Sequence, residues 1–222
     1  MNTTSGQLSK DRDSQAHELN DAVVEYAQAA LDALHVENLF EHIPALRTSL
    51  AAAKLVGSVR DHLLLRKLGI YLHALTAISH NDRRSMVARL QADPDFGEDV
   101  GAYLIELLDH TEGQRKPAMI GAVFTAFAFQ QIDARTLRRL NAVIQHLAVT
   151  EIGSVRALDT FNSGKSDSTA RTAPPDRFAV LALSNAGLAE INLAGGKVSY
   201  ALNEVGQRFL ELELDRVRPT TV

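Results

Sequence analysis

Apolar residues recur every three or four positions through most of the chain, which is the spacing that places one side of an α-helix against a core. The first 14 residues are polar and carry no such pattern, so we expect them to form a disordered tail. From Ser14 onward the pattern predicts successive helices over approximately residues 14–38, 44–55, 58–78, 80–93, 95–110, 115–129, 134–147 and 152–161.

Prolines and short polar side chains predict where several of these helices begin and end. Ser79 or Asn81 is expected to cap one helix, and Asp133 another, because a side-chain oxygen at that position accepts a hydrogen bond from a free backbone N–H. Pro94 should end a helix, since the residue before a proline avoids the helical conformation. Pro117 fits a first turn, where its missing N–H costs nothing.

The pattern changes near the C-terminus. After a predicted helix over residues 178–185, apolar and polar residues alternate over 188–193 and again over 197–202, which is the period of a strand. Between these two segments, Gly195 and Gly196 can adopt the positive φ angles that a two-residue hairpin turn requires. A last helix should follow, capped by Asn203.

The predicted fold class is therefore mainly α, a multi-helix bundle with a C-terminal helix, β-hairpin and helix. A stretch rich in Ser, Thr, Gly and Pro precedes this C-terminal unit and predicts a linker or long loop. The expected organisation is a tail over residues 1–14, a helical body over 15–161, the linker over 162–175 and the helix-hairpin-helix unit over 176–222.

The order of helix, "GL", hairpin, "YALNEVG" and helix over residues 176–213 resembles the C-terminal half of a bacterial winged-helix module, in which the hairpin is the wing. The segments RDHLLLRKLGIYLHALTAIS and LIELLD, with the pattern around QQIDARTLRRL, give residues 59–150 a similarity to uncharacterised bacterial all-helical proteins. The first resemblance implies a wing at Gly195, Gly196 and Lys197, and the second implies a helical architecture without implying an activity.

Composition indicates the cellular compartment of the protein. The chain has no cysteine, which excludes disulfides and thiolate metal sites and fits a reducing compartment. Neither a signal-peptide core nor a continuous apolar segment long enough to span a bilayer is present, so we expect a cytoplasmic protein. The formal net charge of -4 gives no general attraction to nucleic acid.

Candidate chemistry is sparse. Glu106 and His110 lie at i and i+4 and could share a helix face, but a metal site in a bundle needs matching ligands from other helices, and no second such pair occurs. The chain has no nucleophile-elbow or dinucleotide-binding motif. We therefore expect no catalytic residues, no cofactor and no metal, and predict that the protein is not an enzyme.

Basic clusters give the better functional lead. Arg135, Arg138 and Arg139 occupy i, i+3 and i+4 of one predicted helix, so their guanidinium groups share a face that could bind an anion or an acidic partner. The alternative is a solvated face balanced by nearby acids. We predict a partner-binding or regulatory protein that forms a homo-oligomer or binds another protein, with the hairpin unit or the Arg135 face as the contact. The alternative is a winged-helix regulator that binds nucleic acid with the same hairpin unit as its wing.

In that alternative the helix over residues 178–185 would enter the DNA groove. Its polar reach is limited to Arg177, Ser184 and Asn185, and residues 171–222 contain six basic and six acidic residues. We therefore expect that face of the helix to be buried.

Overall fold

The computed structural model describes residues 59–94, 96, 100–163, 176–194 and 197–219. The predicted tail, the first two predicted helices, nearly all of the predicted linker and the turn glycines Gly195 and Gly196 lie outside these residues. The described elements are α4 (Val59–Ala74), η1 (Leu75–Ala77), α5 (His80–Gln91), α6 (Val100–Asp109), α7 (Arg115–Ala128), α8 (Ala134–His146), η2 (Val149–Glu151), α9 (Ile152–Ser163), α10 (Arg177–Asn185), β1 (Ala189–Ala194), β2 (Lys197–Leu202), α11 (Glu204–Glu211) and η3 (Leu214–Arg216). A mainly helical chain with a hairpin between helices near its C-terminus confirms the predicted fold class.

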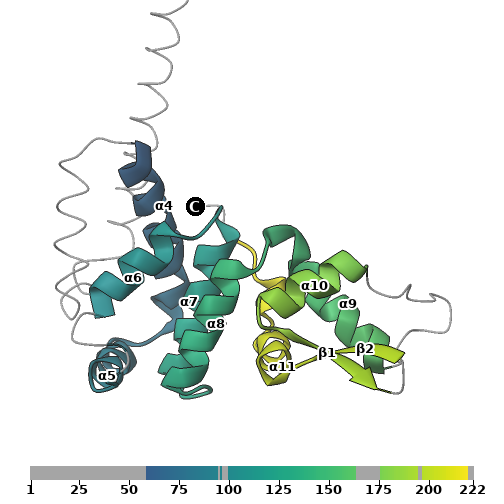
Figure 1. Cartoon of the computed structure of the whole chain (residues 1–222). Coiled ribbons are helices and arrows are strands. Elements are labelled where there is room, and N and C mark those ends of the chain that lie inside the picture. The colour runs from purple at the N-terminus through teal and green to yellow at the C-terminus, as the bar shows by residue number, and fades with distance from the viewer. Residues whose placement is uncertain (1–58, 95, 97–99, 164–175, 195–196, 220–222) are drawn as a thin grey trace, which may run out of the picture.

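Helix α7 is the central helix of the first lobe, which comprises α4 to α8 (Figure 1). It packs against α4, α5 and α8, and its apolar residues Ile120, Val123, Phe124 and Phe127 are buried as predicted. Arg89 of α5 donates to the carbonyl oxygens of Phe127 and Ala128, so a cation provides hydrogen bonds to carbonyls that have no helical partner at the C-terminal end of α7.

The predicted helix caps are confirmed. Of the two residues offered for α5, Ser79 is the cap, and its hydroxyl accepts from the Asp82 N–H. Asp133 accepts from the Thr136 N–H at the start of α8. Asn203 caps α11 by accepting from the Gly206 N–H, and its Nδ2 donates to the Gly187 carbonyl. One side chain therefore links the start of α11 to the residues that precede β1.

The second lobe is built around the two-stranded antiparallel sheet of β1 and β2. Helix α9 packs against β2 and α10, and its Asn162 side chain donates to the carbonyl of Tyr200. Gly206 lets α11 approach the hairpin closely, since a Cβ at this position would collide with the Leu188 carbonyl. Thus α9, which precedes the predicted linker, packs with the elements that follow it.

One hydrophobic cluster runs through both lobes. It contains Leu68 and Leu140 of the first lobe together with Leu183, Leu202 and Phe209 of the second. The predicted boundary between a helical body and a C-terminal unit stays a prediction. The shared cluster shows that the described parts of both pack against each other.

Candidate functional site

The second lobe exposes several large apolar side chains. Five lie on α10 and the hairpin, namely Phe178, Leu181, Ile191, Leu193 and Val198. Single exposed apolar residues are ordinary on a protein surface, whereas several in one small unit indicate an interaction site.

Three of these side chains share one face of the hairpin. Residues 191 and 193 alternate with polar residues on β1, and Leu193 pairs with Val198 across the strands, so Ile191, Leu193 and Val198 point to the same side. Nearer the core, the same face holds Leu202, which is buried. The apolar face of the hairpin therefore continues past the edge of the core into solvent, where Leu193 is 79% and Val198 51% exposed. We call Ile191, Leu193 and Val198 the hairpin surface.

Helix α10 corrects an expectation from the sequence. Its face that would enter a DNA groove was expected to be buried, but Phe178 is 80% and Leu181 47% exposed. This short helix carries its own apolar side chains on several sides, and only the side with Val180 and Leu183 packs against the core. Among the polar residues of α10, Arg177 and Asn185 are exposed, so this helix offers one cation and one amide to phosphates.

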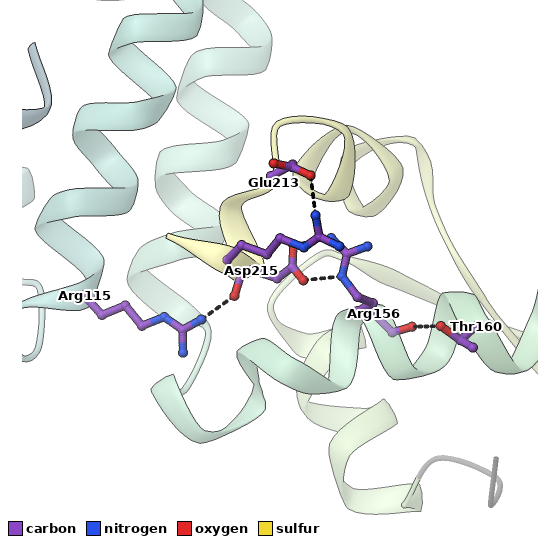
Figure 2. Close-up of polar contacts among 6 residues, drawn as sticks. Arg115, Arg156, Thr160, Glu213 and Asp215 are labelled. Carbon is purple, nitrogen blue, oxygen red and sulfur yellow. Dashed lines mark hydrogen bonds and ion pairs between the residues drawn. The ribbon is translucent and has the colours of Figure 1, made fainter. Parts of the chain in front are cut away.

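Polar contacts from the C-terminal segment fasten the second lobe to the first (Figure 2). The Arg156 guanidinium of α9 holds both carboxylate oxygens of Asp215, with Nε–Oδ2 and Nη2–Oδ1 distances of 2.5 and 2.8 Å. Arg115, at the start of α7, donates to the carbonyls of Asp215 and Val217. The hydrogen bond from Asp215 raises the pKa of Arg156, whereas burial and then the charge of Arg218 lower the pKa of Arg115.

The neighbouring Lys116 is buried and also forms a hydrogen bond within the protein. Its side chain is only 3% exposed and donates to the Gln145 carbonyl at 2.9 Å. Desolvation lowers the pKa of its ammonium group, and Glu112 partly opposes that effect. The basic pair Arg115 and Lys116 therefore holds helices and chain segments in place.

The three arginines of the predicted anion-binding face differ in their surroundings. Arg138 forms an ion pair with Asp93 at 2.7 Å, and its guanidinium group lies 5.2 Å from the centre of the Phe96 ring. Arg135 and Arg139 are exposed on α8. The structure thus leaves two guanidinium groups, one helical turn apart, on the surface for an anion or acidic partner.

Of the predicted wing, only the backbone of Lys197 lies among the described residues, and it pairs with Ala194 at the start of β2. Within the described ranges, no group of three or more His, Asp or Glu side chains is placed to hold a metal ion. His110 instead contacts the Glu106 carbonyl through its own Nδ1 at 2.8 Å. No helix in the same ranges combines the length and hydrophobicity needed to cross a membrane.

The sequence predicted the strands and named the hairpin unit as one of two candidate contacts, but it did not identify Ile191, Leu193 and Val198 as the exposed side chains. The alternation of apolar residues was the available signal, but it does not say how far along the hairpin the core extends. A comparison with models of protein families, with curated proteins and with solved structures finds no match to this chain.

Proposed function

We propose that this protein is a non-enzymatic interaction module that associates with a second copy of itself through the hairpin surface. The observation that carries the proposal is the apolar face of the hairpin, which extends beyond the core at Leu193 and Val198. We retain the cytoplasm of a bacterial cell as the proposed setting, on the absence of cysteine and the resemblances described above.

The exposed side chains of the hairpin surface cost free energy while they remain in water. Each Å² of apolar surface removed from water contributes about 25 cal/mol. A second hairpin offers the same apolar face, so a symmetric contact would cover both copies at once. The polar face of the hairpin, with Glu190, Asn192 and Ser199, would remain in solvent.

The alternative, a winged-helix regulator that binds nucleic acid, has weaker support. The exposed face of α10 is largely apolar and offers Arg177 as its one cation, and Arg138 is already paired with Asp93. A role for Arg135 and Arg139 in binding DNA predicts salt-sensitive affinity that the double substitution to Glu abolishes.

Sedimentation velocity over a range of concentrations tests self-association. The variant Leu193→Thr/Val198→Thr keeps residues that favour strands but removes the apolar surface, so we expect its dimer to dissociate at a concentration at least tenfold higher than wild type, as a loss of about 1.4 kcal/mol would give. Leu63→Gln is the matched control, because Leu63 is 52% exposed on α4, outside the hairpin. A wild-type protein that stays monomeric, or a control with the same effect, would reject the proposal.

A further inference from the structure

A cavity of about 580 Å³ lies between the first lobe and the C-terminal segment. Its floor is formed by α7 and α4, with Ala118, Ala122 and Ala126 one helical turn apart along α7. Leu212 and Val217, on either side of η3, form the opposite wall. The volume lies within the range of small-molecule sites, which are mostly apolar with a few polar groups that fix orientation.

The cavity extends along α7. It follows α7 from Ala118 to Phe129, which at the rise of an α-helix is a length of about 16 Å. A cavity floor of this length accommodates an extended aliphatic chain lying along the helix.

The charged side chains that line the cavity differ in whether they form ion pairs. Glu211 and Glu213 line it, but each is paired with an arginine, Arg208 at 2.7 Å and Arg216 at 2.6 Å. Arg218 also lines the cavity and, within the described part of the chain, forms no ion pair with a carboxylate. The cation that remains uncompensated is therefore Arg218.

The position of Arg218 fixes the polar end of the site. The residue before it, Val217, accepts a hydrogen bond through its carbonyl from Nε of Arg115, the first residue of α7, so Arg218 lies near the start of that helix. The helix dipole is positive at the same end, and Gln114 provides no side-chain cap there. An anionic group at this end would pair with Arg218 and would interact favourably with the dipole.

We propose that this cavity binds an unbranched aliphatic carboxylic acid, with its carboxylate on Arg218 and its chain along the alanine face of α7. The apolar floor removes the chain from water, and the guanidinium group holds the carboxylate through charge-assisted hydrogen bonds. The site is separate from the hairpin surface, so the inference does not depend on the proposed self-association.

Isothermal titration of the full chain with decanoate tests the inference. We expect one decanoate per chain, with affinity about tenfold lower in Arg218→Gln, a loss of about 1.4 kcal/mol, because the charge-assisted hydrogen bonds to the carboxylate are removed. Ala122→Phe should abolish binding by filling the floor, which is half-buried at this residue. Binding of 1-decanol, which has the chain without the charge, should be the same in wild type and Arg218→Gln.

Arg84→Gln is the matched control, because this arginine is exposed on α5 and does not line the cavity. The absence of saturable binding to wild type would overturn the inference, as would an equal loss in the control or an equal loss of 1-decanol in Arg218→Gln. Ala122→Phe and Arg218→Gln are independent, so misfolding of the first leaves the second to decide. A change in sedimentation of Ala122→Phe without decanoate binding in wild type would assign the cavity to a protein contact and also reject the acid.

Discussion

Gly121 of α7 allows the closest helix contact in the first lobe. A Cβ placed at this position would lie 2.5 Å from the Cβ of Ala74 and 2.9 Å from the Tyr71 carbonyl, both on α4. These are fixed atoms close to the helix backbone, so neither can move away without shifting α4. The small side chain of Ala74 and the absent one of Gly121 together set the separation of the two helices.

We therefore predict that Gly121→Ala destabilises the protein by about 1–3 kcal/mol, the usual cost of forcing extra atoms into a packed core. Gly69→Ala is the control, since Gly69 lies within α4 and an added methyl group would meet no atom within 4 Å. That substitution should stabilise the helix by about 0.5–1 kcal/mol. Urea unfolding of both variants, followed by circular dichroism, measures the difference, and equal effects would contradict the packing argument.

The sequence predicted single residues unevenly. Periodicity placed Val123 and Phe124 correctly in the core, because large apolar side chains at helical spacing need a partner surface. It could not single out Gly121, since a glycine required by close packing looks the same in sequence as one that is merely tolerated. Nor could it place Arg218 beside a cavity, because the cavity walls come from segments about 100 residues apart.

At the scale of elements, local chemistry predicted the helix boundaries well. Pro117 lies in the first turn of α7, and Gly187 adopts a positive φ of 83° where α10 ends. Such signals act within a few residues and need no tertiary context. The exposed face of α10 was predicted wrongly because a nine-residue helix with apolar residues on several sides does not reveal which side meets the core.

The cap of α8 predicts a pH dependence. Hydrogen bonds from the side chain and then the backbone N–H of Thr136 lower the pKa of Asp133 in the folded protein. Asp133 thus binds a proton less readily in the folded state than in the unfolded chain, where the pKa of an aspartate is about 3.9. The contribution to stability is complete above that value and is lost as the pH falls through the lower folded pKa.

We expect Asp133→Asn, which keeps a capping oxygen but cannot titrate, to flatten the fall in unfolding free energy on acidification in that range. Urea unfolding between pH 6 and pH 2.5 provides the measurement. Glu190→Gln, at an exposed position on the polar face of β1, is the control and should retain the wild-type slope. A slope unchanged in Asp133→Asn would show that the cap carboxylate does not contribute to acid sensitivity.

At the scale of the whole molecule, the two lobes are joined by both apolar and polar contacts. The shared core links Leu140 of α8 with Phe209 of α11, and α11 packs against α8. Asp215, whose side chain is only 6% exposed, adds a bidentate ion pair with Arg156 and a carbonyl contact with Arg115. These contacts favour cooperative unfolding of the described residues, whereas the composition shift at 162–175 favours two independent units.

Native-state hydrogen exchange distinguishes these two arrangements. With one cooperative core, the slowest amides of α7 and those of α11 should report the same opening free energy. Asp215→Ala should then lower both by the same amount, about 1–3 kcal/mol, because the loss of the carboxylate leaves Arg156 without its paired acceptor. A lower opening free energy in α11 than in α7, with only the former reduced by Asp215→Ala, would instead support a C-terminal unit that opens by itself. The control Glu190→Gln, at an exposed position on β1, should leave both helices unchanged, so that any shared loss in Asp215→Ala is assigned to the junction between the lobes.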